Sequence, residues 1–145
     1  MSYYKTQSDG TRVPFDEGGL VSYETTLTAS ATMRVEDSGR TFNIGTDALV
    51  MTLPAITDGN VGMSFKFRNI GADGNNLITI SPAATDGIVG TVANAAADSV
   101  ASGVVDKNIV NTKATANIGD WIELTAVAPT KWFITGGVGI WASEA

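Results

Sequence analysis

Short runs in which apolar and polar residues alternate, separated by glycine-containing turns, constrain the fold of this chain most strongly. In the run 63–68, Met63, Phe65 and Phe67 fall on one face, and Ser64, Lys66 and Arg68 fall on the other. A period of two is typical of a β-strand with one buried and one solvated face. Residues 49–53 and 121–127 follow the same pattern and are predicted to be strands as well.

Further short runs rich in Val, Ile and Thr predict about ten strands in all. The remaining candidates are residues 27–33, 41–44, 77–81, 88–92, 104–110, 131–135 and 138–142. We find no helical pattern of about ten residues with the 3.6-residue apolar period of an amphipathic helix. Residues 93–102 are small and nearly featureless, and they fit a loop better than a short helical turn. We therefore expect an all-β fold with a single compact β-sandwich or β-barrel-like domain.

The turns use a restricted set of residues. Asp-Gly occurs at 9–10, 58–59, 73–74 and 86–87, and Asn-Ile-Gly occurs at 43–45, 69–71 and 117–119. Glycine supplies the positive φ that tight turns require. Each Asn-Ile-Gly is followed within two residues by an aspartate, which indicates one type of turn used three times. Because the motifs are 26 and 48 residues apart, we do not expect a solenoid or propeller repeat.

The first 24 residues differ from the rest, and we divide the chain into residues 1–24 and a β-rich body of residues 25–145. The first segment holds isolated apolar residues among Gly, Pro and acidic residues, with neither strand nor helix period. We interpret it as an extended N-terminal arm whose anchors are Tyr3, Tyr4, Phe15 and Leu20. The arm either lies on its own body or docks on a neighbouring chain, and a frayed terminus is the alternative.

The absence of histidine and cysteine limits the chemistry open to this protein. It removes the commonest general base, thiolate nucleophiles and the usual zinc ligands. Phosphate-binding loops are also missing from the sequence, and Ser-x-x-Lys occurs only as Ser2-Tyr3-Tyr4-Lys5 in the N-terminal segment. A carboxylate-based hydrolase stays open, but most acids lie in turns (Asp58, Asp73, Asp86 and Asp120), where they are expected to cap local backbone. We expect no enzyme, no cofactor and no metal, since residues 73–76 hold only a fragment of a calcium loop.

The charge of the chain bears on its partners and its location. The net charge is −6 and the pI is near 4.4, which is the wrong sign for binding nucleic acid. No run approaches the length of about 20 apolar residues that spans a membrane, and the N-terminus lacks the pattern of a secretion signal. We therefore expect neither nucleic acid nor a membrane as a partner, and synthesis in a cytoplasm.

Two features suggest a contact surface on the body. Lys66 and Arg68 form the densest basic pair, on the polar face of their strand. Trp121, Trp132 and Trp141 gather near the C-terminus, and each fits either the core or an interface. We predict Lys66, Arg68 and Trp141 as interface residues of the body, with a plain solvated face as the alternative for the basic pair.

The run Thr41-Phe42-Asn43-Ile44-Gly45-Thr46-Asp47-Ala48-Leu49-Val50-Met51-Thr52-Leu53-Pro54-Ala55 carries a resemblance, together with Trp132-Phe133-Ile134 and Gly139-Ile140-Trp141. In these parts the chain resembles small virion proteins of tailed bacteriophages, above all the capsid decoration, or cementing, proteins. The resemblance implies a tulip-like β body with an N-terminal arm. It also implies a homotrimer on the outer capsid surface that stabilises the shell against internal DNA pressure.

The partners implied by this resemblance are the major capsid protein and, through the arm, neighbouring decoration trimers. The location implied is the capsid surface of the virion, after synthesis in the host cytoplasm. Similar β domains occur in phage head fibres and tail fibres. A fibre module that recognises a host glycan or protein is therefore the alternative function.

Overall fold

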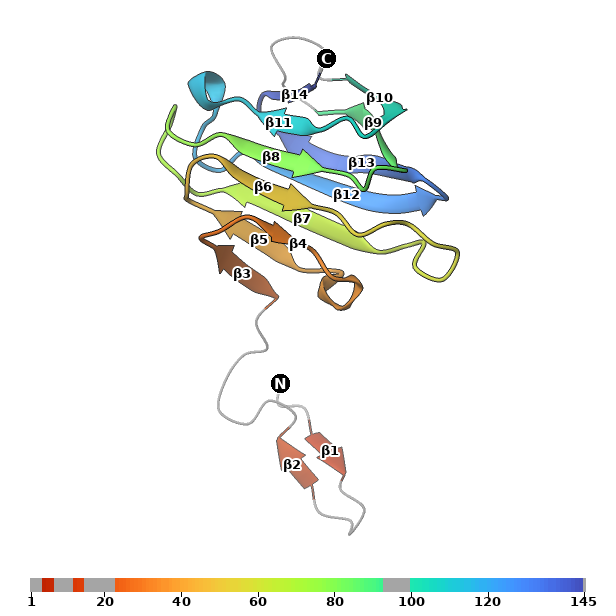
Figure 1. The fold of residues 1–145 in the computed structure, drawn as a ribbon. Coiled ribbons are helices and arrows are strands. Elements are labelled where there is room, and N and C mark those ends of the chain that lie inside the picture. Colours follow the sequence, from red (N-terminus) through yellow and green to blue (C-terminus); the bar gives the residue numbers. More distant parts are fainter. Residues whose placement is uncertain (1–3, 7–11, 15–22, 93–99, 145) are drawn as a thin grey trace.

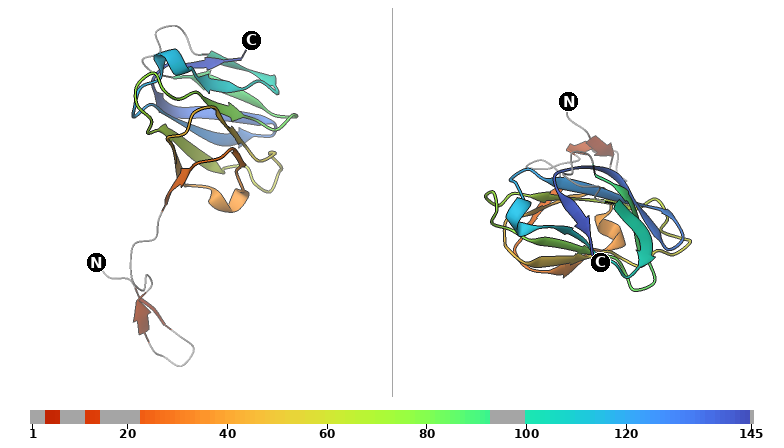
Figure 2. Two further views of the ribbon diagram at one scale, coloured as in Figure 1. Left: turned by 60° about the vertical axis from the view of Figure 1, so that its left-hand side comes forward. Right: turned by 90° about the horizontal axis from the view of Figure 1, so that it is seen from above.

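The computed structural model describes residues 4–6, 12–14, 23–92 and 100–144, and these residues form an all-β structure (Figure 1). β1 (Tyr4–Thr6) and β2 (Arg12–Pro14) pair with each other as a separate antiparallel sheet. The other strands form two mixed sheets that pack together as a compact β-sandwich, seen in two further directions in Figure 2. The all-β sandwich expected from the alternating runs is confirmed.

The larger sheet has seven strands in the order β10-β9-β13-β12-β7-β5-β3. The smaller sheet has five strands in the order β14-β11-β8-β6-β4. The strands of the larger sheet are β3 (Glu24–Leu27), β5 (Thr41–Ile44), β7 (Ser64–Asn69), β9 (Gly87–Thr91), β10 (Val100–Val105), β12 (Trp121–Ala128) and β13 (Lys131–Val138). Those of the smaller sheet are β4 (Ala31–Thr32), β6 (Leu49–Thr52), β8 (Ile78–Ser81), β11 (Ile109–Asn111) and β14 (Trp141–Ser143).

From β3 to β8 the chain passes from one sheet to the other after every strand. As a result β3, β5 and β7 are parallel neighbours in the larger sheet, and β4, β6 and β8 are parallel neighbours in the smaller one. The first half of the body is therefore wound as a short coil. The second half adds the antiparallel pairs β7–β12, β12–β13 and β9–β10.

Three predicted strands each cover parts of two strands. The predicted strand 138–142 includes the end of β13 and the start of β14. The predicted strand 27–33 divides into the end of β3 and β4, and the predicted strand 104–110 divides into the end of β10 and β11. Each pair has one member in each sheet. The predicted loop 93–102 is corrected at its end, since β10 begins at Val100, and residues 93–99 lie outside the described part.

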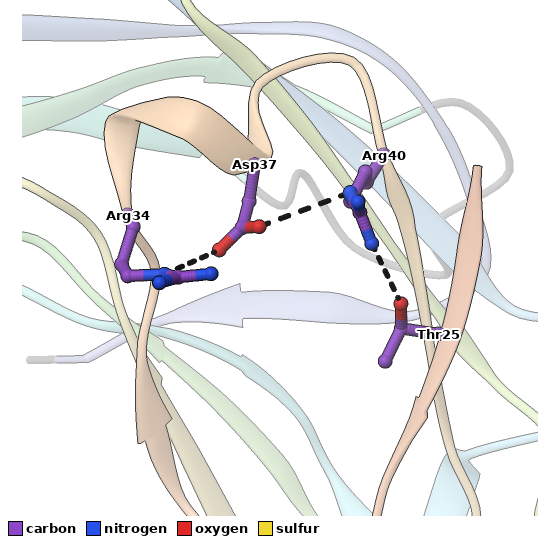
Figure 3. A network of polar contacts seen from close by, with 4 residues as sticks. All are labelled: Thr25, Arg34, Asp37 and Arg40. Atoms are coloured by element: carbon purple, nitrogen blue, oxygen red, sulfur yellow. Dashed lines mark hydrogen bonds and ion pairs between the residues drawn. The ribbon is translucent and has the colours of Figure 1, made fainter. Parts of the chain in front are cut away.

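One crossing between the sheets is fixed by a small polar network (Figure 3). The short 3₁₀-helix η1 (Val35–Asp37) joins β4 to β5. Asp37 accepts a hydrogen bond from Arg34 Nε at 3.3 Å and lies 3.8 Å from Arg40 Nε. Arg40 in turn donates to Thr25 Oγ1 at 3.4 Å. The carboxylate thus holds the two arginines on either side of the crossing.

The core lies between the sheets and is formed by the inward positions of the alternating runs. Phe65 and Phe67 on β7 and Met51 on β6 are buried, as the period of two predicts. Phe42 stacks on Phe67 with ring centroids 5.8 Å apart, and Phe65 lies 5.9 Å from the ring of Trp132. Aromatic pairs at such distances add stability beyond the area that they bury.

Candidate functional site

Of the predicted arm anchors, Tyr3, Phe15 and Leu20 lie outside the described residues. Tyr4 is the first residue of β1, where its backbone is in register with Pro14. The role of these four residues as anchors therefore stays a prediction.

The two basic residues predicted as contact surface lie together on the outer face of the larger sheet. Lys66 and Arg68 are half-buried positions of β7 that alternate with the buried Phe65 and Phe67. Strand pairing places Glu123 beside Lys66, and Trp121 beside Arg68. This arrangement gives the central part of the outer face both charges and an aromatic ring.

Arg68 links three strands of this face. Its Nη1 donates to Glu24 Oε1 on β3 at 2.9 Å and to Asn43 Oδ1 on β5 at 3.3 Å. Its side chain is 33% exposed and that of Glu24 is 54% exposed, so solvent screens the ion pair and its contribution to stability is about 0–1 kcal/mol. The contact orients the guanidinium more than it stabilises the fold.

Lys66 and Trp121 form a second contact on the same face. The Lys66 ammonium lies 4.1 Å from the centre of the Trp121 ring, a cation–π geometry. The ring also lies close to Gly136 on β13, where an added Cβ would be 3.0 Å from its Cη2 atom. Glycine at this position therefore allows the indole to lie close over the neighbouring strand. This contact was not predicted, because Gly136 and Gly137 fall between the predicted strands 131–135 and 138–142, whereas β13 continues through both glycines. Glycine inside a strand is the signal of such a close approach.

Hydroxyl groups continue the network toward β13. Glu123 Oε1 accepts a hydrogen bond from Thr135 Oγ1 at 2.8 Å, and the Thr125 hydroxyl contacts those of Ser64 and Thr135, both at 3.2 Å. We call this surface the linked face; it consists of Glu24, Asn43, Ser64, Lys66, Arg68, Trp121, Glu123, Thr125 and Thr135. Of its two basic and two acidic groups, Arg68 pairs with Glu24, while Lys66 lies over Trp121 and Glu123 accepts from Thr135; oriented charges of both signs can match the charges of a partner.

Trp141, the third predicted contact residue of the body, is in the core and not on the surface. It is fully buried on β14, in register with Asn111, and its Nε1 donates to Val138 O at 3.2 Å. Gly139, with φ 109°, lies between β13 and β14, where the chain passes to the other sheet and carries the indole inside. The expected exposure of Trp141 is therefore wrong.

The aspartates of the turns accept hydrogen bonds from backbone N–H groups, and most of these groups belong to other loops. Asp73 accepts from Ile118 N at 2.8 Å, and Asp86, which is fully buried, accepts from Ile56 N at 2.9 Å. Asp120 accepts from Asn117 N within its own turn at 3.0 Å. The predicted capping by these acids is thus local for Asp120 and between loops for Asp73 and Asp86.

Asp120 also belongs to a buried cluster of polar side chains that joins the two sheets. Asn69 Nδ2, at the end of β7, donates to Asn111 Oδ1 on β11 at 2.9 Å, and Asn111 Nδ2 donates to Asp120 Oδ2 at 3.1 Å. All three residues are buried. We call Asn69, Asn111 and Asp120 the amide cluster. These hydrogen bonds satisfy the buried polar groups within the fold, so the Asp120 carboxylate has a structural role.

An exposed ion pair fixes the loop before β6. Lys113 donates to the Asp47 carboxylate, which also accepts from Leu77 N at 2.8 Å. The ammonium group of Lys113 is the main reason that the pKa of Asp47 lies below its usual range, and the Leu77 N–H adds to it. A lowered pKa means that Asp47 stabilises the fold above pH 4 and that this contribution is lost as the pH falls through its folded pKa.

We therefore expect Lys113→Met to raise the pKa of Asp47 toward its usual value, because the strongest partner of the carboxylate is removed. An NMR titration of the Asp47 side chain measures this shift directly. Lys107→Met is the control and is expected to leave the pKa of Asp47 where it was. An unchanged pKa in Lys113→Met would show that the ion pair is absent in solution.

In the part of the chain that the structure describes, no three Asp or Glu side chains gather as a group that could hold a metal ion. Within the same residues, no helix is long and apolar enough to cross a membrane. No protein-family model matches the chain, and a search of curated proteins finds no match.

Proposed function

We propose that this protein is a structural component of a tailed-phage virion that binds the outer surface of the capsid as a trimer and stabilises the shell. The observation that best supports the proposal is the use of its polar side chains. The amide cluster joins the sheets, turn aspartates accept hydrogen bonds from neighbouring loops, and Arg68 pairs with Glu24 on the linked face. A protein that reinforces a shell needs such a rigid body and no reacting group.

The linked face is the surface of the body that we propose for contact with the major capsid protein. Lys66 and Arg68, the basic residues predicted for this role, are oriented there by Trp121 and Glu24. Preoriented side chains lose less conformational entropy when a partner binds. The N-terminal arm is proposed to add a second contact, on the capsid or on a neighbouring trimer, so that weak contacts are multiplied over many copies.

Deletion of residues 2–20 tests the proposal. We expect the shortened protein to keep its fold and trimeric mass, because the strands of the sandwich begin at Glu24, but to bind expanded capsids of the parent phage poorly. Cosedimentation with capsids measures binding, and circular dichroism with light scattering checks fold and mass. The full-length variant Tyr3→Ala/Tyr4→Ala is the milder companion. Undiminished binding by the deletion would refute the role of the arm, and absence of binding by the intact protein would refute the proposed function.

A fibre module that recognises a host glycan is the second candidate, and Trp121 is the residue that favours it. This half-buried indole is on the outer face, whereas Trp132 and Trp141 are fully buried. Because the Lys66 ammonium lies over the ring, a sugar that stacks on the indole has to displace it. Binding on a glycan array together with quenched tryptophan fluorescence would favour this function over capsid decoration.

A further inference from the structure

The outer face of the five-stranded sheet differs from the linked face in one respect: its strands present no charged side chain. Val50, Thr79, Val110 and Ala142 are neighbours in one row across four strands. Thr32, Thr52 and Ser81 form the next row. These side chains are exposed or half-buried, and Val50 is 38% exposed. We call the seven residues the neutral face.

Charged side chains occur at both ends of the neutral face but not within it. Asp47 and Lys113 pair at the end where β6 begins and β11 finishes. Lys107 and Glu144 lie at the opposite end, where Glu144 N donates to Asn108 O. A centre depleted of charged residues and a polar rim are two of the features of protein interfaces. The pattern is notable in a chain whose net charge is −6.

We propose that the neutral face binds a second copy of this chain, sheet against sheet, about a two-fold axis. Two copies of net charge −6 repel each other, and a surface without charges is where their contact is least opposed. Its small side chains allow two sheets to approach to the spacing of about 10 Å at which sheets pack.

The rim supports a contact between identical copies. Each end of the face carries acidic and basic groups: Asp47 and Lys113 at one end, and Glu144 and Lys107 at the other, where Arg34 follows β4. Whichever ends a two-fold axis brings together, an acid of one copy can therefore meet a base of the other. A two-fold contact uses the same patch on both copies. It makes pairs of single chains, or pairs of trimers if the proposed trimer forms, and does not depend on binding to a capsid.

Sedimentation velocity over a concentration series, with the intact chain and two single variants, tests this inference. The intact chain is expected to reach twice its 15.0 kDa mass, or twice the mass of a trimer. Val50→Lys places an ammonium group within the row of the neutral face and is expected to weaken this association at least about tenfold, because an unpaired charge would be buried. The same substitution makes the net charge of each copy less negative. If general repulsion between copies governed association, the variant would therefore associate more strongly than the intact chain.

Val127→Lys is the matched control. Val127 is a valine on β12, 51% exposed and part of the other sheet, and the variant has the same change in charge. It is expected to associate like the intact chain. Ala142→Lys, at an exposed position of the same row, is expected to repeat the effect of Val50→Lys should that variant fold poorly by circular dichroism. An intact chain with no even-numbered association, or equal association of Val50→Lys, Ala142→Lys and Val127→Lys, would overturn the proposal.

Discussion

Trp141→Ala is expected to lower the free energy of unfolding by about 3–5 kcal/mol, the usual cost of emptying a buried tryptophan site. Trp141 is fully buried between the sheets and its indole N–H is bonded to Val138 O. Its removal leaves a cavity and takes away a hydrogen bond to the Val138 carbonyl where β14 joins the smaller sheet. Urea denaturation followed by circular dichroism measures the loss.

Trp121→Ala is the control for this variant. Trp121 is half-buried on the outer face, so its replacement removes the contact with Lys66 and part of the cover of Gly136. We expect a loss of about 1 kcal/mol, mainly the cation–π contact. Equal losses in the two variants would contradict the assignment of one indole to the core and the other to the surface.

Asn111→Asp is the second change with a large expected effect. The substitution replaces the amide that donates to Asp120 Oδ2 at 3.1 Å by a second carboxylate of the same shape. Two buried carboxylates at hydrogen-bond distance cannot both be ionised without strong repulsion. At pH 7 we expect the free energy of unfolding to fall by about 3–5 kcal/mol, because the folded variant either holds two buried charges side by side or binds a proton that the unfolded chain releases.

The effect of Asn111→Asp should depend on pH. The folded variant keeps a proton between its two carboxyl groups that the unfolded chain releases above about pH 4. Because the folded state then binds more protons, its stability falls as the pH rises from about 4 toward 7. Denaturation at pH 4 and pH 7 is expected to show a smaller deficit at the lower pH.

Asn43→Asp makes the same chemical change in the opposite surroundings. Asn43 accepts from Arg68 Nη1 at 3.3 Å on the linked face, so a carboxylate there gains a basic partner. We expect its stability at pH 7 to change by less than about 1 kcal/mol. A deficit of Asn111→Asp that does not exceed that of Asn43→Asp, or that is the same at both pH values, would argue against a buried amide cluster.

The strands themselves were predictable because local alternation follows directly from burial on one face. Met63, Phe65 and Phe67 are buried, and Lys66 and Arg68 are not, as the period of two requires. The partner strands were not predictable, because alternation is the same in either sheet. The predicted strands 27–33 and 104–110 each continue an extended pattern across the point where the chain leaves one sheet for the other.

The positions of Trp141 and of the amide cluster depend on contacts between residues far apart in the sequence, which local patterns do not predict. A tryptophan near the end of the chain, beside polar residues, matches an exposed site as well as a buried one. Its burial follows from the pairing of β14 with β11, which joins residues about 30 positions apart. The amide cluster likewise brings together one residue from the end of β7, one from the end of β11 and one from the turn before β12. No spacing in the sequence predicts this cluster.

The recurrence of Asn-Ile-Gly has a physical explanation in the wound half of the body. The first two motifs are 26 residues apart, which is one passage through both sheets, and Ile70 N donates to Ile44 O where they stack. The third motif directly precedes the antiparallel strand β12 at the same end of the sandwich, where Gly119 N donates to Asn69 O. The prediction that one type of turn is used three times is wrong, because Gly119 has a positive φ of 93° whereas Gly45 and Gly71 do not have a positive φ. The described residues form a sandwich of two sheets, which agrees with the inference from unequal spacing, although the chain passes between the sheets after every strand from β3 to β8.

The position of β12 and β13 in the larger sheet has a consequence for how the protein is made. These two strands lie between the pair β9–β10 and the wound strands β7, β5 and β3, although they are synthesised after all of them. While the ribosome has not yet released residues 121–138, the larger sheet consists of two separate pieces. The coil has time to assemble as it emerges, whereas the larger sheet can close only after residues 121–138 have emerged as well.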